Sequence, residues 1–486
     1  MSMIRIENLT FYYPSSVDPV FENANFQIAT EWNLGFVGRN GQGKTTLLKI
    51  LLGEYEYSGR IISSVLFDYF PFPVSDKTQI TDEILAEICP NAPKWELMRE
   101  LSYLKVEEDV LWRPFETLSN GEQTKVLLAA LFLKEENFLL IDEPTNHLDV
   151  CARRQVADYP KKKKGFLLVS HDRYLLDECT DHILSLNRAD IEVQSGNFSS
   201  WLENFERQQK FERNQNERLR KDIRRLKESA KQSEGWSNKV EASKRGAADK
   251  GYVGHKAAKM MKRSKVAQAR QEKALMEKSK LLKNEESVDS LKLNPLIYHS
   301  NTLVSFSDTA IIYDHNQFCD PVTFKVERGE RVIIDGKNGS GKSSLLKLLL
   351  KYPIEHTGKV ELGSGVIISY VPQDTSYLEG TLTEFADQYK LEAGLFKAVL
   401  RKMDFERIQF EKDMSEFSEG QKKKVLLAKS LCEPAHLYVW DEPLNYIDVY
   451  SRMQMEELIK EFAPTMLLVE HDVTFRDQIA TKIVEV

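Results

Sequence analysis

Short apolar runs alternate with helical patterns at both ends of the chain. Early runs of strand length lie at Leu34–Val37, Phe138–Ile141 and Phe166–Val169, and a helical pattern at Thr46–Leu52 follows the first of them. Such continuous runs are typical of strands that are buried on both faces of a parallel sheet. The pattern predicts α/β domains with ligand sites at the strand ends.

The sequence then repeats itself almost 300 residues later. Four motifs recur in the same order: RNGQGKTTLLKILL as KNGSGKSSLLKLLL, LSNGEQ as FSEGQK, LLIDEPTNHLDV as YVWDEPLNYIDV, and LLVSHD as LLVEHD. Their offsets are 298, 299, 299 and 300 residues. A repeat in near-constant register indicates a duplicated module. We therefore predict one α/β domain over residues 1–200 and a second over residues 299–486.

The segment between the two modules has a helical pattern instead. One apolar seam begins at Leu219, and a second seam with seven-residue spacing begins at Met260. Glycines between Gly235 and Gly254 interrupt both seams and are predicted to hold a turn. We predict a long antiparallel helical hairpin over residues 201–298, with about 30 to 35 residues in each helix and a reach of roughly 45 to 50 Å.

Charge is distributed unevenly along the chain. The formal net charge is −7, yet residues 201–290 contain 24 Lys and Arg against 14 Asp and Glu. From residue 250 to residue 270, seven residues are basic and none is acidic. Such a run favours contact with nucleic-acid phosphates, and a solvated helix face is the alternative. The candidate RNA and tRNA contacts are Lys250, Lys256, Lys259, Lys262, Arg263, Lys265 and Arg270.

Composition disfavours several classes of protein. No stretch approaches the roughly 18 apolar residues of a membrane span. The first residues also lack the basic segment and apolar run of a secretory signal. The five cysteines have no CxxC spacing, which argues against zinc, iron–sulfur clusters and a disulfide framework. The sequence predicts a cytoplasmic protein that does not enter the membrane.

Two glycine-rich motifs predict nucleotide sites. GRNGQGKT and GKNGSGKS each follow an apolar strand and open a helix, which is the context of a P-loop. Glycines let backbone N–H groups approach the phosphates, the helix N-terminus adds positive potential, and the lysine reaches the terminal phosphates. The predicted ATP contacts are Gly38, Asn40, Gly41, Gly43, Lys44, Thr45 and Thr46 in the first motif, and Gly336, Asn338, Gly339, Gly341, Lys342, Ser343 and Ser344 in the second.

An Asp-Glu pair ends an apolar strand in each module. The aspartate and the hydroxyl that follows the P-loop lysine are suited to the Mg²⁺ shell, whereas the glutamate is suited to polarise the attacking water. The predicted catalytic bases are Glu143 and Glu442. The predicted Mg²⁺ ligands are Thr45, Asp142, Ser343 and Asp441.

Two histidines and two tyrosines also recur in the repeat. His171 and His471 lie at the end of another apolar strand, 29 and 30 residues after the aspartates, and are predicted to contact the γ-phosphate. Tyr13 and Tyr313 lie 25 and 23 residues before their P-loops. Stacking on adenine is predicted for both tyrosines, with packing in a core as the alternative.

LSNGEQ and FSEGQ resemble the signature motif of ABC ATPases, and the resemblance covers the whole chain. In that family two cassettes close head to tail, so each ATP lies between one P-loop and the opposite signature. The resemblance implies a monomer with an internal cassette dimer, which hydrolyses ATP to ADP and phosphate. Site one would join Lys44, Thr45, Asp142, Glu143 and His171 to Ser418 and Gly420; site two would join Lys342, Ser343, Asp441, Glu442, His471 and the Q-loop Mg²⁺ ligand Gln373 to Ser119 and Gly121.

Both modules depart from the ABC pattern. Phe72 of YFPFP stands where the second module has the Q-loop glutamine Gln373. Asn120 and Glu419 stand at the third position of the signature, which is usually glycine, and Phe417 replaces the opening leucine of the second copy. We expect two competent but unequal ATPase sites, with altered Mg²⁺ coupling and closure at site one.

Further motifs resemble the ABC-F branch, whose members act on ribosomes. EPTNHLD and the charged insert between two cassettes carry this resemblance, whereas WDEPLNYIDV, WRPFETLS and KRSK are similar to the Lsa-type antibiotic-resistance branch. That branch implies entry into the exit site of the large ribosomal subunit with ATP bound. The hairpin would pass the peptidyl-site tRNA towards the peptidyl transferase centre of 23S rRNA, displacing lincosamides, streptogramin A compounds and pleuromutilins.

Three other functions stay open at this point. A housekeeping ABC-F translation factor would share the ribosome but not the drug protection. The ATPase subunit of a drug exporter is disfavoured, because exporter cassettes have no use for a basic hairpin. A DNA-associated ABC ATPase is disfavoured because cysteine pairs are absent and the insert is short for coiled-coil arms.

Overall fold

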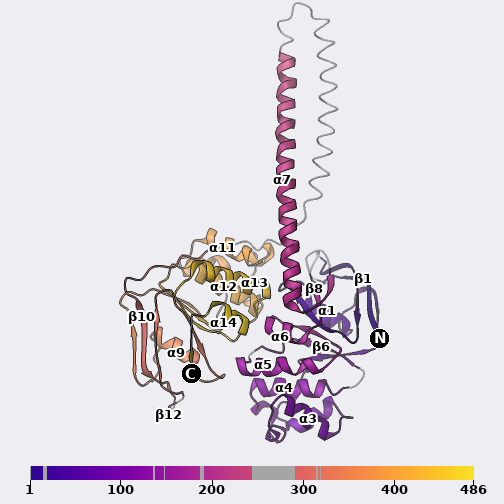
Figure 1. The fold of residues 1–486 in the computed structure, drawn as a ribbon, viewed down its shortest axis with the longest axis vertical. Coiled ribbons are helices and arrows are strands. Elements are labelled where there is room, and N and C mark those ends of the chain that lie inside the picture. Colours follow the sequence, from indigo (N-terminus) through magenta and orange to yellow (C-terminus); the bar gives the residue numbers. More distant parts are fainter. Residues whose placement is uncertain are drawn as a thin grey trace, which may run out of the picture. The chain divides into compact units, whose positions relative to one another are not determined.

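The computed structural model describes residues 2–14, 19–134, 137–146, 148–186, 191–242, 291–313, 316–317 and 319–486. The chain divides into two compact units. One unit, Met1–Trp201 with Val288–Val486, contains both copies of the repeated motifs. We call its first segment, Met1–Trp201, cassette one and its second segment, Val288–Val486, cassette two. The other unit is Leu202–Ser287 and contains most of helix α7 (Phe198–Ala242), which Figure 1 shows as one continuous magenta helix.

Cassette one combines a mostly parallel sheet, an antiparallel sheet and surrounding helices. Its strands are β1 (Met3–Phe11), β2 (Phe21–Ala29), β3 (Asn33–Gly38), β4 (Ser58–Ile62), β5 (Leu66–Phe70), β6 (Asn137–Asp142), β7 (Phe166–Val169), β8 (His182–Leu186) and β9 (Ile191–Ser195). Its helices are α1 (Lys44–Leu51), α2 (Thr81–Ile88), α3 (Lys94–Tyr103), α4 (Asn120–Leu131), α5 (Val150–Asp158), α6 (Arg173–Cys179) and the short 3-10 helices η1 (Glu108–Trp112), η2 (Phe115–Thr117) and η3 (Pro160–Lys162).

The larger sheet of cassette one has the order β5-β6-β7-β3-β8-β9, and the smaller has the order β2-β1-β4. The first five strands of the larger sheet are parallel, and β9 runs antiparallel to β8. The three apolar runs of the sequence lie in β3, β6 and β7, and every residue of β3 and β7 is buried. The predicted buried parallel sheet is confirmed, and helix α1 packs between the two sheets in one hydrophobic cluster.

Cassette two repeats this plan. Its parallel sheet has the order β16-β17-β18-β14-β19 and its antiparallel sheet the order β13-β10-β15, beside a β11-β12 pair; Figure 1 shows β10 at one side of the cassette and helices α12 and α13 at the other. The strands are β10 (Thr302–Thr309), β11 (Ile312–Tyr313), β12 (Asn316–Gln317), β13 (Val322–Glu327), β14 (Arg331–Asp335), β15 (Lys359–Leu362), β16 (Ile368–Val371), β17 (Leu437–Asp441), β18 (Met466–Val469) and β19 (Lys482–Glu485). The helices are α9 (Lys342–Leu349), α10 (Leu382–Gln388), α11 (Ala393–Lys402), α12 (Glu419–Cys432), α13 (Val449–Phe462), α14 (Val473–Ile479), η5 (Arg407–Glu411) and η6 (Met414–Glu416).

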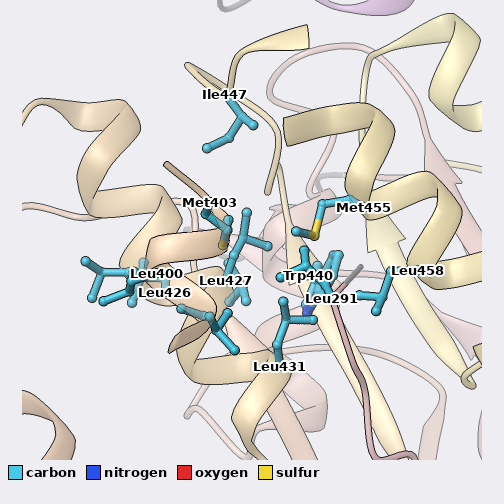
Figure 2. Close-up of a cluster of buried hydrophobic side chains, with 14 of the residues drawn as sticks. Leu291, Leu400, Met403, Leu426, Leu427, Leu431, Trp440, Ile447, Met455 and Leu458 are labelled. Atoms are coloured by element: carbon cyan, nitrogen blue, oxygen red, sulfur yellow. The ribbon is translucent and has the colours of Figure 1, made fainter. Parts of the chain in front are cut away.

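A buried hydrophobic cluster fixes α12 to the parallel sheet of cassette two. Figure 2 shows Leu427 and Leu431 of α12 beside Trp440 of β17 and Met455 of α13. The indole N–H of Trp440 donates a hydrogen bond to the hydroxyl of Ser430 at 2.9 Å. Burying a leucine or methionine side chain stabilises the fold by about 1.5–3 kcal/mol. The cluster therefore holds the signature helix against the strand that carries the second Asp-Glu pair.

Helix α7 differs from the predicted hairpin arm. It contains 45 residues, so it is about 68 Å long, which exceeds the predicted arm. It also continues through Gly235 to Ala242, so the first eight residues of the stretch predicted to hold the turn are helical, and the turn itself stays a prediction. One glycine inside a helix costs only about 1 kcal/mol relative to alanine, which the rest of a long helix tolerates. Among the described helices, none is long and apolar enough to cross a membrane.

The end of the predicted linker packs with cassette two. Leu291 and Leu293 are buried in the same cluster as Trp440, and Tyr298 is buried against the antiparallel sheet. Their alternating apolar pattern suits an extended segment that lies on a core. The second predicted helix, the rest of the predicted turn and the candidate RNA contacts Lys250, Lys256, Lys259, Lys262, Arg263, Lys265 and Arg270 lie outside the described residues.

Candidate functional site

Each P-loop folds around its own lysine. The Lys44 ammonium donates to the carbonyl oxygens of Gly38 at 2.7 Å and Arg39 at 3.1 Å. Lys342 makes the equivalent contacts in cassette two, at 2.8 and 2.7 Å. Both ammonium groups are therefore held inside the loop, where the terminal phosphates of a nucleotide bind in P-loop enzymes.

The last glycine of each P-loop caps the helix that follows. Gly43 and Gly341 have φ values of 101° and 93° and stand at the N-caps of α1 and α9. Glycine adopts this left-handed conformation without steric cost. A Cβ on Gly43 would also come within 2.5 Å of the side chain of Val20. Glycine is thus the residue that suits this position, and the helix N-terminus that follows it presents backbone N–H groups of the kind that bind phosphate.

Site one is a cavity of about 640 Å³ that both cassettes line. It brings together all the residues predicted for site one except Gly38, which contributes its carbonyl to Lys44. The lining residues are Tyr13, Asn40, Gly41, Gly43, Lys44, Thr45, Thr46, Tyr69, Pro71, Asp142, Glu143, Asn146, Val169 and His171 of cassette one, with Ser418, Glu419, Gly420 and Tyr446 of cassette two.

Site two is a smaller cavity of about 430 Å³. Of the predicted residues, Gly336, Asp441, Ser119 and Gly121 do not line it. Asp441 lies just behind, where its carboxylate accepts from Ser343 Oγ at 3.0 Å. The Ser119 hydroxyl is engaged in the capping box of α4 with Glu122. The lining residues are Tyr313, Asn338, Gly339, Gly341, Lys342, Ser343, Ser344, Gln373, Glu442 and His471, with Asn120 of cassette one.

The two cassettes meet closely at site one. Asn40 of the first P-loop donates through Nδ2 to the carbonyl oxygen of Tyr446 at 2.7 Å. A Cβ on Gly420 would lie 2.5 Å from that oxygen and 3.0 Å from Asn40 Nδ2. At Gly121, the equivalent position of the first signature, the nearest atom to such a Cβ lies 3.7 Å away. Only a glycine fits at position 420, so the second signature is tightly seated.

Asp142 anchors the acidic end of site one. Its Oδ2 atom accepts from Thr45 Oγ1 at 3.2 Å and from the hydroxyl of Tyr69 at 3.0 Å. Beside it, Glu143 Oε1 lies 3.5 Å from His171 Nε2. Burial, and then the charge of Asp142, raises the pKa of Glu143 to about 8. Burial, and then the charge of Lys44, lowers the pKa of His171 well below its ordinary value. At neutral pH His171 is therefore neutral and Glu143 is largely protonated.

Glu442 of site two is held differently. Its Oε2 atom accepts from Gln373 Nε2 at 2.9 Å and from Asn445 Nδ2 at 2.6 Å, and its Oε1 atom lies 3.5 Å from His471 Nε2. Burial alone would raise the pKa of Glu442, but contact with His471 and the charge of Lys423 more than offset it and lower that pKa. Glu442 is thus ionised and oriented at neutral pH, whereas Glu143 is not.

The oxygen atoms of both sites suit Mg²⁺. Glu143 Oε1 and Asp441 Oδ2 are buried and have no hydrogen-bond partner among the described residues. The described part of the chain also contains no cluster of three His, Cys, Asp or Glu residues suited to hold a metal alone. Protein Mg²⁺ sites commonly use one or two carboxylates, with phosphate oxygens and water completing the shell. The pairs Asp142–Thr45 and Asp441–Ser343 fit that mode of binding.

The predicted adenine-stacking tyrosines lie at the edges of the cavities. Tyr13 is 37% exposed and Tyr313 is 44% exposed. Their hydroxyls share hydrogen bonds with Thr46 Oγ1 at 2.7 Å and Ser344 Oγ at 2.8 Å. Each ring therefore has an accessible part next to its P-loop helix, and stacking on adenine stays a prediction.

The sequence interpretation missed several lining residues. Asn146 of site one and Asn445 beside Glu442 share the third position after the glutamate in both copies, so the repeat itself could have revealed them. Tyr69 and its counterpart Tyr370 also recur, but only Tyr69 has a described hydrogen bond to the neighbouring aspartate. No sequence pattern indicated that Tyr446 would approach Asn40.

Comparison with known proteins agrees with this geometry. The family described as ABC transporter matches residues 21–146 and again 319–445. The ribosome protection protein VmlR of Bacillus subtilis (strain 168) is 27% identical over 471 residues, covering 94% of this chain and 82% of VmlR. The energy-dependent translational throttle protein EttA of Haemophilus influenzae is 26% identical over 505 residues, covering 93% of this chain and 86% of EttA.

A solved structure has the same fold. The archaeal ribosome recycling factor aABCE1, in complex with the stalk protein aP1, matches with a TM-score of 0.64 at 20% identity, covering 98% of this chain and 87% of that chain. Two family matches in one chain agree with the two P-loops, signatures and Asp-Glu pairs, and the relatives agree with the ABC-F resemblance. The chain belongs to the ABC family as an ATP-hydrolysing protein with two ABC cassettes.

Proposed function

We propose that this chain is a cytoplasmic ABC-F ATPase that binds the ribosome with ATP and leaves after hydrolysis. The observation that carries the proposal is the combination of two cavities of nucleotide-site composition with an insert that begins as a 45-residue helix. The insert continues into the basic run of residues 250–270. A long cationic element joined to two ATP-dependent clamps suits a partner made of RNA.

The proposed roles of the site residues follow from their positions. Lys44 and Lys342 neutralise the terminal phosphates, and the opposite signatures complete the closed sites. Glu442 accepts the proton of the attacking water, as Glu143 does in its ionised form, and His171 and His471 orient the γ-phosphate. Mg²⁺, when bound at Asp142 and Thr45 or at Asp441 and Ser343, neutralises charge on the phosphates.

The relatives support a ribosomal partner. VmlR is named for ribosome protection, EttA for a translational throttle, and aABCE1 for ribosome recycling. We infer entry at the exit site of the large subunit, with the linker of residues 201–298 directed past the peptidyl-site tRNA to 23S rRNA at the peptidyl transferase centre. On the Lsa-type resemblance, the drugs displaced are lincosamides, streptogramin A compounds and pleuromutilins.

A ribosome sedimentation experiment tests the binding cycle. The double variant Glu143→Gln and Glu442→Gln binds ATP without hydrolysing it, so with ATP it should sediment with ribosomes in a sucrose gradient. The matched control adds Lys44→Ala and Lys342→Ala, which removes the phosphate contacts and should return the protein to the top of the gradient. If the double glutamine variant stays at the top with ATP, ribosome binding is refuted.

Drug protection is tested separately, because the similarity to EttA favours a housekeeping factor as the second candidate. A susceptible host that expresses the chain should tolerate several-fold more lincomycin or tiamulin, whereas a host that expresses the double glutamine variant should gain no protection. Unchanged inhibitory concentrations with intact ribosome binding would favour the housekeeping factor. Drug accumulation should be unchanged by expression; lowered accumulation would favour an exporter subunit.

A further inference from the structure

Helix α12 holds the Q-loop of cassette two at two points. We call residues 372–375 Q-loop two. The ammonium of Lys423 donates to the carbonyl oxygen of Pro372 at 2.9 Å. The hydroxyl of Thr375 donates to the carboxylate of Glu419, one turn earlier on the same helix. These two contacts enclose Gln373, which reaches Glu442 at 2.9 Å.

Lys423 is an unusual residue for its position. It is 2% exposed, although lysine is almost never fully buried without compensation. Desolvating an ammonium costs several kcal/mol unless polar groups replace the lost water. Here the carbonyl of Pro372 accepts one hydrogen bond, and the negative charges of Asp441 and Glu442 act on the ammonium. The lysine therefore places a positive charge between Q-loop two and the acidic end of site two.

Cassette one lacks the four side chains that build this arrangement. In register, Thr124 replaces the lysine, Asn120 replaces Glu419, Val74 replaces Thr375, and Phe72 replaces the glutamine. Valine has no hydroxyl to donate, and threonine has no ammonium to place under the loop. The four differences between the cassettes thus fall on residues that contact one another or the same loop in cassette two.

We propose that Lys423 and Glu419 are positioning residues of site two, which hold Q-loop two so that Gln373 keeps Glu442 oriented for hydrolysis. The proposal rests on Glu442 acting as the base of site two. Because Glu419 also lines site one, its hydrogen bond to Thr375 connects the signature that closes site one with the Q-loop of site two. A lysine that only fills the core would fix neither the loop nor the base.

The test uses full-length protein with Glu143→Gln, so that site two alone retains its glutamate. Lys423→Met keeps the stem and removes the charge, whereas Thr375→Val removes one hydroxyl and leaves the signature intact. Matched controls are Thr124→Ala, at the equivalent position of α4, and Lys429→Met, which removes a lysine on α12 that pairs with Glu433. The readouts are kcat and KM for ATP, affinity for a fluorescent ATP analogue without Mg²⁺, and the melting temperature.

A loss of positioning should appear in kcat. A misplacement of about 1 Å can cost on the order of a hundredfold in rate, so we expect a loss of at least about tenfold for Lys423→Met and a smaller loss for Thr375→Val. KM and analogue affinity should stay within about twofold, since the P-loop is untouched, and Lys423→Arg should restore part of kcat. Both controls should keep the kcat of the background.

Three results would overturn the proposal. The first is a kcat within twofold of the background for both Lys423→Met and Thr375→Val. The second is a Lys423→Met variant whose kcat and melting temperature both fall while the kcat of Thr375→Val is unchanged, because a purely structural lysine would behave in this way. The third is a Glu143→Gln background no faster than Glu143→Gln with Glu442→Gln; this refutes hydrolysis at site two itself and is recognised without any Lys423 variant.

Discussion

Replacing Arg173 by methionine should destabilise the contact between the cassettes far more than loss of a surface ion pair does. Arg173 of α6 forms a two-pronged ion pair with Glu456 of α13, in which Nη2 donates to Oε1 and Nη1 donates to Oε2 at 3.1 Å. Their side chains are 7% and 8% exposed. The equivalent positions of the repeat are Val473 and Ala157, so the pair has no symmetric counterpart.

The magnitude follows from burial. Burial raises the pKa of Glu456, against the opposing effect of Arg173. Removing one partner of a buried pair leaves the other charge uncompensated and costs about 3–5 kcal/mol. The exposed pair Arg207–Glu203, at 75% and 69% exposure, should contribute less than about 1 kcal/mol. Replacing both buried partners by methionine should recover most of the loss, because desolvation of both charges is then avoided.

Urea unfolding of four variants measures this effect. Arg173→Met, Glu456→Met and their combination form a double-mutant cycle, with Arg207→Met as the surface control. A chain with several domains need not unfold in one step, so the midpoint of the first transition is compared by fluorescence and circular dichroism. The reasoning is refuted if Arg173→Met shifts that midpoint no more than Arg207→Met does, or if the double variant is as unstable as the sum of the single changes.

Three further predictions concern the nucleotide sites. With Glu442→Gln, hydrolysis depends on Glu143, so kcat/KM should rise with pH and level off only above about pH 8. With Glu143→Gln, hydrolysis depends on Glu442, whose pKa is lowered, so kcat/KM should rise well below neutral pH. The profile of kcat/KM is the one to measure, because it reports the ionisation of groups in the free enzyme. Gly420→Ala should lower ATPase activity by at least about tenfold, because its methyl group meets the carbonyl oxygen of Tyr446, and Gly121→Ala should cost less; equal losses in steady-state assays would contradict this. Tyr69→Phe should weaken the apparent affinity of site one for Mg²⁺ by a few-fold, because it removes one hydrogen bond of about 0.5–1.5 kcal/mol to Asp142. A Mg²⁺ titration of ATPase activity measures this, and Tyr370→Phe should have the smaller effect.

The nucleotide sites were predictable from sequence because their chemistry is local. Gly43, Lys44 and Thr45 are consecutive, and a left-handed glycine before a helix needs no distant partner to bind phosphate. Their recurrence about 300 residues later separated them from chance matches. The pairing of Ser418 and Gly420 with the first P-loop followed only from the family resemblance, since no local pattern predicts which surfaces meet.

The missed features depend on packing between distant residues. Arg173 and Glu456 are 283 positions apart, and neither stands in a repeated motif. Phe72 signalled a difference at site one, but the hydroxyl that reaches Asp142 belongs to Tyr69, three residues earlier. Gly235 shows the limit of a local signal, because a single glycine does not end a helix that continues to Ala242.

The two sites differ in how far each is organised before a nucleotide binds. At site two, Gln373 and Asn445 hold an ionised Glu442, so little reorganisation is needed when the water attacks the γ-phosphate, and preorganised groups of this kind lower the barrier most. At site one, Glu143 is mostly protonated, but the second signature seats tightly against the P-loop at Asn40. We therefore expect site one to contribute mainly to closure and site two mainly to hydrolysis. Because α12 contributes Ser418 and Gly420 to one cavity and holds Gln373 in the other, the division of labour does not make the sites independent: a closure that moves this helix must also move the Q-loop beside Glu442.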